Sequence, residues 1–313
     1  MQNFITSVNT TLPLVIMLAV GYFLGQIHMI SHDFIKQANK LNYWLFLPCS
    51  VFAGTYCKKV DFNEGISVVI AEVVIILTTF AAGLIISRLI SKEENKRGTI
   101  AVSLCRSNYV YIGTPIVCAV FGVTSSVYAS LVVAVLAVVC NIMSPFCFAS
   151  NSGTKLSLKK MLKNVFANSY IIASILAVIL MINHCPQFPE PIHKSISTLG
   201  SVCTPLALVT LGASFDFKKV GINKGILIWT NFIKLVVFPL IGSIVLIALG
   251  FRGEAFAALF VYLICPTATV VFTLAQAYGG DSELASEIVV TQTVLSMITM
   301  TIGIFIMKSL GLF

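Results

Sequence analysis

Charged residues are scarce in this chain, since Lys, Arg, Asp and Glu make up 10% of its 313 residues. Ordinary soluble domains contain about 25% charged residues. Hydrophobic residues account for 58% of the sequence, which excludes an ordinary water-soluble enzyme and favours a polytopic protein of the lipid bilayer. The net charge of +8 does not indicate nucleic acid as a partner. Its basic residues lie in short loops between apolar segments and form no basic face.

Motifs for catalysis, phosphate binding and metal binding are also missing. No Walker-type glycine-rich loop occurs, and no Ser/His/Asp or Cys/His set can be assembled. The nine cysteines include no CxxC pair, and most lie in apolar segments, where cysteine packs as a small hydrophobic residue. We therefore predict that the protein is not an enzyme and has no cofactor, while coupling to H⁺ or Na⁺ stays open.

Ten apolar segments can be drawn, taking about 20 residues per crossing as the yardstick. The first lacks the basic residues and cleavage site of a secretory signal, so it is expected to stay as a span. Lys and Arg gather after the first, third, fifth and seventh segments, which predicts cytoplasmic loops there and both termini outside. The segments are 12–27, 35–56, 66–90, 99–121, 127–149, 165–182, 196–215, 225–249, 255–278 and 284–307.

Prolines recur at corresponding places in the two halves of the chain. Pro48 and Pro205 lie in the second segment of each half, and Pro115 and Pro266 lie in the fourth. With five segments in each half, the pattern predicts two inverted five-helix repeats. Prolines are frequent in membrane helices, however. Two of them have no counterpart in the other half, Pro145 and Pro239.

The repeats divide the chain into three predicted units. Residues 1–149 form the first repeat, 150–164 a basic cytoplasmic linker, and 165–313 the second repeat. A protein of this kind is expected as a multi-pass protein of the plasma membrane, which in a bacterium is the inner membrane.

The fourth segment contains a polar stretch, and placing such residues in lipid is energetically costly. Arg106 and Asn108 are followed by Gly113-Thr114-Pro115, which we expect to break the helix. Gly113 would end the first half-helix, and Thr114 would cap a second one that begins at Pro115. The free N–H groups of such a half-helix favour an anion. A plain proline kink without a ligand is the alternative.

The ninth segment is expected to break in the same way at Cys265-Pro266-Thr267, with Thr269 as a further hydroxyl. Interrupted helices in corresponding positions of two halves indicate a transporter site near the middle of the membrane. We therefore expect the two breaks to cross there, so that both contribute to substrate binding.

Three charged residues lie deep within apolar segments: Glu72, Arg106 and Lys234. Each would cost about 2.5–3.5 kcal/mol at the centre of a span. Glu72 could pair with Lys234, or relay protons, which would leave Arg106 for a carboxylate that matches its planar fork of donors. The alternative for Arg106 and Lys234 is that both side chains extend towards the cytoplasmic surface.

Amides inside the spans have two interpretations. Asn108 lies beside the expected break and is assigned to the substrate, whereas Gln276 is a candidate for ion coupling. Asn141 and Gln292 fit equally well as residues that only join helices through hydrogen bonds.

Four stretches together resemble the auxin efflux carrier family, over nearly the whole chain. Their order and spacing carry the resemblance. The stretches are Leu47-Pro48 with the preceding 36–42, Arg106-x-Asn108-x4-Gly113-x-Pro115, Thr204-Pro205-Leu206-Ala207-Leu208 followed by Leu211-Gly212-Ala213-Ser214, and Pro266-Thr267-Ala268 followed by Ala275-x-Ala277-Tyr278-Gly279.

The resemblance implies two inverted repeats with crossed, broken fourth and ninth helices at the substrate site. It also implies a scaffold of spans 1, 2, 6 and 7, a moving domain of spans 3–5 and 8–10, and a homodimer. Substrates in the family are organic anions: auxin in plants, and malate, malonate and similar carboxylates in bacteria. Plant carriers have a long central loop and an Asn beside the crossing proline. Here the linker is short, and Gly113, Thr114 and Cys265 occupy that neighbourhood, which argues against auxin itself.

The sequence thus predicts a secondary transporter of small carboxylates that works by elevator-type alternating access. One alternative is a sodium-coupled symporter of the bile-acid transporter type, with Gln276 or Glu72 at the ion. Another is a membrane receptor that transports nothing. The predicted substrate-binding residues are Arg106, Asn108, Gly113, Thr114, Pro115, Pro266, Thr267 and Thr269; Glu72, Lys234 and Gln276 are predicted to balance charge or couple an ion.

Overall fold

The computed structural model describes residues 2–56, 62–121, 126–152, 169–183, 185–215, 221 and 223–313. In these ranges the regular secondary structure is helical, and no strand occurs. Six of the described helices are long and apolar enough to cross a membrane, which agrees with the predicted all-α, polytopic class. They are Asn3–Gln26, Asn63–Ile90, Val127–Phe148, Glu190–Ala213, Lys224–Ala248 and Ser282–Ser309.

The other predicted segments are helical too, but shorter or interrupted. Segment 165–182 begins outside the described residues and is seen as α9 (Ser169–Ile182). The interrupted segments are 35–56, with α2 (His32–Leu41), η1 (Asn42–Phe46) and α3 (Leu47–Thr55); 99–121, with α5 (Glu94–Cys105), η2 (Tyr109–Gly113) and α6 (Thr114–Phe121); and 255–278, with α14 (Gly253–Ile264) and α15 (Val270–Tyr278).

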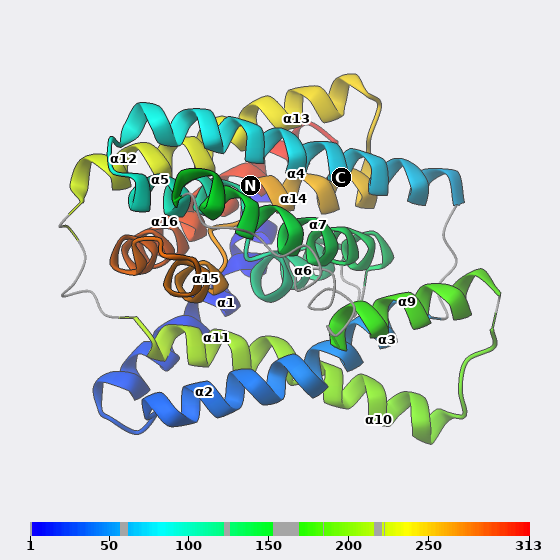
Figure 1. Ribbon diagram of the computed structural model, residues 1–313. Coiled ribbons are helices and arrows are strands. Elements are labelled where there is room, and N and C mark those ends of the chain that lie inside the picture. Colours follow the sequence, from blue (N-terminus) through cyan, green and yellow to red (C-terminus); the bar gives the residue numbers. More distant parts are fainter. Residues whose placement is uncertain are drawn as a thin grey trace.

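Most helices run side by side across the view of Figure 1. The α2, α10 and α11 helices form a layer at the bottom, and α4, α12 and α13 lie at the top, with α5, α6, α14 and α15 between them. The core therefore lies around the short helices, of which α5 and α14 are buried along most of their length. The remaining elements are α1 (Gln2–Gln26), α4 (Phe62–Ile90), α7 (Val127–Ser152), α10 (Glu190–Ser201), α11 (Cys203–Ala213), α12 (Lys224–Phe232), η4 (Ile233–Val237), α13 (Phe238–Ala248) and α16 (Ser282–Ser309).

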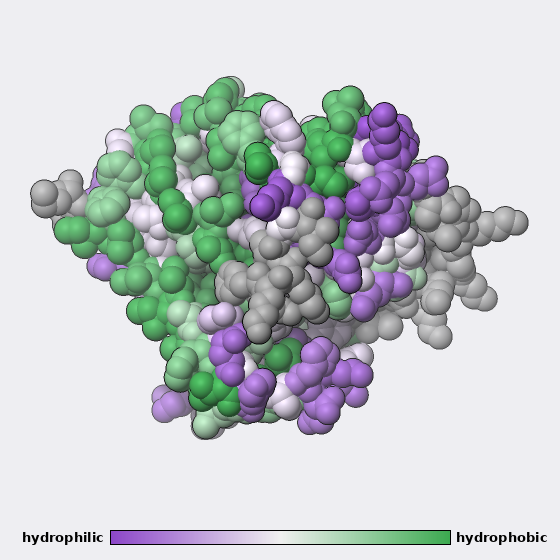
Figure 2. Space-filling model, turned by 90° about the vertical axis from the view of Figure 1, so that its left-hand side faces the viewer, coloured by the Kyte–Doolittle hydropathy of each residue, from purple (hydrophilic) through white to green (hydrophobic). Residues whose placement is uncertain are grey.

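The end of the molecule at the left of Figure 1 gathers the starts of α2, α5 and α12, which follow the predicted cytoplasmic loops. Viewed from that end, hydrophilic residues collect over the centre and right of the face, and hydrophobic residues cover its left part (Figure 2). The predicted linker at 150–164 begins inside α7, which continues to Ser152. The rest of the linker lies outside the described residues.

Three π-helical turns explain how prolines are accommodated inside spans. In each turn the first residue beyond it donates its N–H to a carbonyl five residues earlier. A proline follows one residue later, where it lacks an N–H and would crowd the preceding turn of an α-helix. The wider turn relieves this conflict, so these spans continue past their prolines. The three pairs are η1 with Pro48, η2 with Pro115 and η4 with Pro239.

Glycines bring α1 and α11 into direct backbone contact. A Cβ atom at Gly21 would collide with the carbonyl of Val209, and one at Gly25 would lie 2.8 Å from the carbonyl oxygen of Ala213. From the other side, a Cβ atom at Gly212 would collide with the carbonyl of Leu18. Small residues allow such close approach in membranes, where packing replaces the hydrophobic effect as the main force between helices.

We expect Gly21→Ala to lower the stability of the protein by about 1–3 kcal/mol, because α1 and α11 must separate to admit the methyl group. Thermal unfolding in detergent would measure the effect. Gly225→Ala is the matched control, since a Cβ atom there meets nothing within 4 Å. Equal melting temperatures for the two variants would contradict the tight packing of α1 on α11.

Candidate functional site

The interruption of the fourth segment lies earlier than the sequence suggests. Helix α5 ends at Cys105, and Arg106 is extended, with φ −82° and ψ 95°. The chain becomes helical again at Tyr109 and continues through Gly113, Thr114 and Pro115 without a break. The prediction that Gly113-Thr114-Pro115 breaks the helix is therefore wrong, because the π turn of η2 absorbs the proline.

The interruption of the ninth segment lies where it was predicted. Helix α14 ends at Ile264, and Cys265 is extended, with φ −62° and ψ 141°. Pro266, Thr267 and Ala268 continue outside any helix, and α15 begins at Val270. In this span the proline itself belongs to the extended segment, since no π turn precedes it.

The two extended segments cross and pair with each other. Ser107 and Thr267 form an antiparallel bridge. The N–H of Asn108 donates to the carbonyl of Pro266 at 2.7 Å, and the N–H of Ala268 donates to the carbonyl of Arg106 at 2.8 Å. Backbone at membrane depth must find its hydrogen-bond partners within the protein. Here the backbone groups of each extended segment find hydrogen-bond partners in the other segment.

Thr267 ties the crossing to α5 and α16. Its hydroxyl lies 2.5 Å from the carbonyl oxygen of Ser103 and 2.7 Å from Oε1 of Gln292, which also accepts the N–H of Thr267 at 3.0 Å. Gln292 in turn donates through Nε2 to the carbonyl of Thr230 at 3.3 Å. All of these groups are buried. Gln292 therefore binds the crossing itself, beyond joining two helices.

We expect Thr267→Val to destabilise the protein by about 1–3 kcal/mol, the usual cost of leaving buried polar groups unsatisfied. Valine has nearly the shape of threonine, so the loss would come from the hydrogen bonds and not from a cavity. Thermal unfolding compared with Thr273→Val, whose hydroxyl is exposed, would test this. A melting temperature for Thr267→Val as high as that of the control would contradict it.

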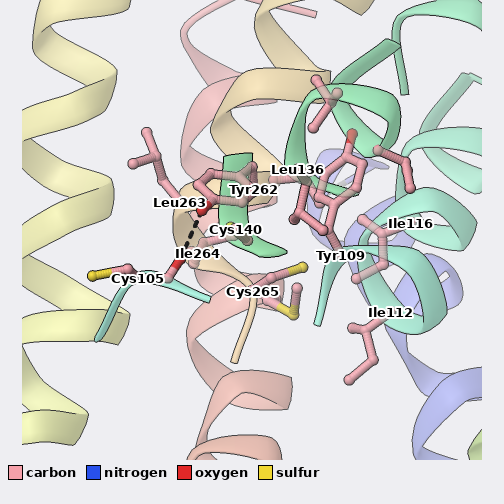
Figure 3. Close-up of a cluster of buried hydrophobic side chains, with 14 of the residues drawn as sticks. Cys105, Tyr109, Ile112, Ile116, Leu136, Cys140, Tyr262, Leu263, Ile264 and Cys265 are labelled. Carbon is pink, nitrogen blue, oxygen red and sulfur yellow. Dashed lines mark hydrogen bonds between the residues drawn. The ribbon is translucent and has the colours of Figure 1, made fainter. Parts of the chain in front are cut away.

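Lys234 reaches the crossing from η4. Its Nζ donates to Oγ of Ser107 at 2.6 Å, and that hydroxyl donates to the carbonyl of Tyr262 at 2.7 Å. Tyr262 donates through Oη to the carbonyl of Cys105 at 2.6 Å, as Figure 3 shows. These carbonyls belong to the last turns of α14 and α5, where a positive charge is favourable.

Lys234 is 1% exposed, and its Nζ lies 5.5 Å from the centre of the Tyr262 ring. Its side chain is therefore directed into the protein and not towards the membrane surface. Arg106 is equally enclosed, at 8% exposure. Neither side chain adopts the extended, surface-directed arrangement that was the alternative for both.

The guanidinium group of Arg106 is held by α7. Nη2 donates to Oδ1 of Asn141 at 2.9 Å, and Nη1 donates to Oγ of Ser144 at 3.2 Å. Both partners are neutral, and none of the acidic residues that the structure describes forms an ion pair with Arg106. A buried cation without a counter-ion is costly. The site is therefore electrostatically prepared for an anion.

Glu72 lies in α4 with no exposed surface, and both of its carboxylate oxygens lack a hydrogen-bond partner. The suggested pair with Lys234 is not formed, because the ammonium group of Lys234 binds Ser107 instead. The structure therefore does not join Glu72 to the crossing through any hydrogen bond or ion pair between described residues.

The remaining predicted residues are distributed around the crossing. Thr114 and Pro115 line a cavity of about 570 Å³ between α3, α6, the start of α7 and α10, whereas Gly113 is buried against the Tyr109 ring. Asn108 is buried, and its Nδ2 lacks a hydrogen-bond partner. Thr269 is partly exposed before α15, and Gln276 is exposed two turns further along that helix. Gln276 is thus exposed, whereas Glu72 and Lys234 are buried.

Ser107, Tyr262 and Ser144 were not predicted from the sequence. Serine and tyrosine are common in membrane helices, so their types alone give no signal. Ser107 lies between two predicted residues, Arg106 and Asn108, and Ser144 lies one helical turn after Asn141. This spacing places Asn141 and Ser144 on one face of α7, which was the available hint.

Comparison with known proteins gives consistent matches over nearly the whole chain. The sequence model described as "Membrane transport protein" matches residues 6–304. An uncharacterized transporter of Methanocaldococcus jannaschii is 25% identical, over 91% of this chain and 94% of its own length. An uncharacterized transporter of Methanothermobacter thermautotrophicus is 20% identical, over 95% of this chain and 97% of its own length. Both interrupted spans lie within the matched regions.

Proposed function

Because this chain belongs to the membrane transport protein family, which is that of the auxin efflux carriers, we propose that it is a secondary active transporter of small organic anions. The resemblance noted from the sequence is thereby confirmed, and so is the assignment to multi-pass membrane transporters. Compact carboxylates such as malate or malonate are the proposed substrates, and the plasma membrane is the proposed location.

The observation that carries this proposal is the uncompensated guanidinium group at the crossing. Arg106 stands at the end of α5 and is buried, and among the described residues Asn141 and Ser144 are the hydrogen-bond partners of its side chain. A carboxylate would supply the missing negative charge and match two parallel N–H donors. The unpartnered Nδ2 of Asn108, two residues away, offers a further donor.

The cavity at Thr114 and Pro115 is the proposed outer access to this site. Its lining is rich in hydroxyl groups, and none of the described residues that line it is Lys, Arg, Asp or Glu. A polar, uncharged lining of this kind admits hydrated molecules and does not bind ions of either sign tightly. Its volume of about 570 Å³ is ample for a small carboxylate with its water.

Two groups of helices with tight internal packing support an elevator mechanism. The close glycine contacts that the described residues show fall into two groups of helices. Such contacts hold the backbones within a group together, so that each group is suited to move as one body. The pairs are α1 with α11 and α3 with α10 in the first group, and α4 with α5, α5 with α7, α13 with α14, and α14 with α16 in the second.

These groups fit the division that the family resemblance implies. The first corresponds to the scaffold of spans 1, 2, 6 and 7, and the second to the moving domain of spans 3–5 and 8–10. Ten spans in two inverted repeats, both termini outside and a homodimeric assembly remain part of this proposal.

A proton is the preferred coupling ion. Sodium coupling of the bile-acid transporter type needs free oxygens at the helix ends, but three carbonyls there already accept hydrogen bonds. They are those of Ser103, Cys105 and Tyr262. Lys234 moreover places its ammonium group at the crossing, where it would oppose a bound sodium ion. Glu72, with two oxygens free to take up a proton, is the proposed proton site.

Purified protein in proteoliposomes would test the function. We expect saturable uptake of labelled malonate or malate that needs no sodium and responds to a pH gradient. Uptake that requires sodium would replace the proposal by the symporter alternative. Binding of these acids in a thermal-shift screen without any flux would favour a receptor. Neither binding nor flux with any small carboxylate would reject the proposed substrate class.

A further inference from the structure

Helix α7 carries a pair of residues whose arrangement goes beyond joining helices. Asn141 and Ser144 are three residues apart, which places them on the same face of α7. Each uses its side-chain oxygen to accept one N–H from the Arg106 guanidinium, at 2.9 Å and 3.2 Å. Ser144 has no exposed surface, so its contact with Arg106 is sheltered from water and lipid.

Pro145 lies inside α7 and removes one backbone hydrogen-bond donor from this part of the helix. It has no N–H to donate to the carbonyl four residues earlier, which is that of Asn141. No counterpart of this proline occurs in the other half of the chain, as the sequence shows. The helix is thus weakened at the residue whose side chain holds Arg106.

The anchored guanidinium lies apart from the cavity. Along the chain at the start of α7, the cavity is lined by Ser126, Ser130 and Val133. Asn141 follows Val133 by eight residues, a rise of about 12 Å along an α-helix. Arg106 is not among the residues that line the cavity. The two regions are therefore separate along the path that a substrate would take.

A guanidinium group has five N–H donors. Asn141 and Ser144 take one donor from each terminal nitrogen, which fixes the plane of the group and leaves three donors. We propose that Asn141 and Ser144 are positioning residues, which hold the Arg106 guanidinium at the crossing so that its remaining donors face a substrate carboxylate. This inference rests on the proposed function, because it assigns the orientation of the proposed anion site.

Asn141→Asp gives a direct test, because it places a carboxylate where a neutral amide oxygen now lies 2.9 Å from Nη2. That carboxylate supplies the counter-ion which the substrate would otherwise provide. We expect the variant to melt at a higher temperature than the native protein. We also expect its affinity for malonate to fall by about 10- to 100-fold, the usual effect of losing a charged hydrogen-bond pair. A residue that only joins helices would not move stability and affinity in opposite directions.

A higher or unchanged melting temperature with unchanged affinity for malonate would overturn the inference. Should Asn141→Asp fail to fold, Ser144→Ala provides a second test, with an expected increase in KM of about 3- to 10-fold at nearly constant maximal rate. An unchanged KM in that variant would equally overturn the inference.

The double variant Asn141→Asp with Arg106→Gln is the matched control, in which the gain in melting temperature should vanish. Retention of that gain would show that the new carboxylate acts elsewhere, and would also overturn the inference. Failure of the proposed function is distinguishable, because the native protein itself would then neither bind nor transport malonate or malate.

Discussion

Replacing Arg106 by glutamine is expected to reduce kcat/KM for carboxylate uptake by about 100-fold or more, as for truncation of one partner in a buried charged pair. Glutamine keeps hydrogen-bond capacity and much of the length of arginine but removes the charge. Because Arg106 is buried and has no acidic partner among the described residues, its charge serves no internal ion pair. Its removal should therefore impair anion binding far more than folding.

Two further variants sharpen this expectation. Arg88→Gln makes the same chemical change at an exposed position in the last turn of α4 and should leave uptake unaffected. Arg106→Lys keeps the charge but loses the planar fork, so its uptake should fall between those of the native protein and Arg106→Gln. Uptake measured in proteoliposomes at several substrate concentrations would separate KM from the maximal rate. Normal uptake by folded Arg106→Gln would remove Arg106 from the substrate site.

The positions of the two helix interruptions could be predicted from the sequence only in part. Pro266 correctly marked the break in the ninth segment, because there the proline lies in the extended part. In the fourth segment the prediction based on Pro115 was wrong, because a π turn lets the helix continue through this proline. Proline disfavours an α-helical turn in both places. The sequence does not say whether the chain responds by breaking or by widening.

For the charged residues, the sequence indicated their location in the spans but not their hydrogen-bond partners. Sequence position marked Arg106, Lys234 and Glu72 as charges deep within apolar segments but left surface-directed side chains open for Arg106 and Lys234. The structure shows that all three are buried. Their hydrogen-bond partners are known only from the structure. Lys234 binds Ser107, a residue without any distinguishing pattern, and Arg106 binds a helix some 35 residues away. Partners contributed by distant helices follow from how the helices pack, which hydropathy does not encode.

Replacing Glu72 by glutamine is expected to abolish the dependence of transport on a pH gradient while leaving substrate exchange intact. Glu72 has no exposed surface, and its two carboxylate oxygens accept no hydrogen bond from the residues that the structure describes. Burial without a donor penalises a carboxylate strongly and a neutral carboxyl group much less. The side chain therefore suits a group that crosses the membrane protonated and releases its proton where water reaches it. Glutamine imitates only the neutral form.

The size of the effect follows from the energy of the gradient. One pH unit across the membrane is worth about 1.4 kcal/mol per proton, which can concentrate a substrate about tenfold when one proton accompanies each molecule. Proteoliposomes of the native protein should reach that ratio, and those of Glu72→Gln should not accumulate substrate at all. Exchange of labelled for unlabelled malonate, which needs no net proton movement, should persist in the variant.

Glu94→Gln, at an exposed position in the first turn of α5, is the matched control and should accumulate substrate normally. Tenfold accumulation by Glu72→Gln would place the coupled proton on another group, since glutamine cannot carry it. Loss of exchange together with accumulation would assign Glu72 to the transport cycle itself and not to its coupling. The two outcomes matter because no hydrogen bond between described residues joins Glu72 to the crossing. Coupling would therefore act through the charge of Glu72 and not through a shared contact.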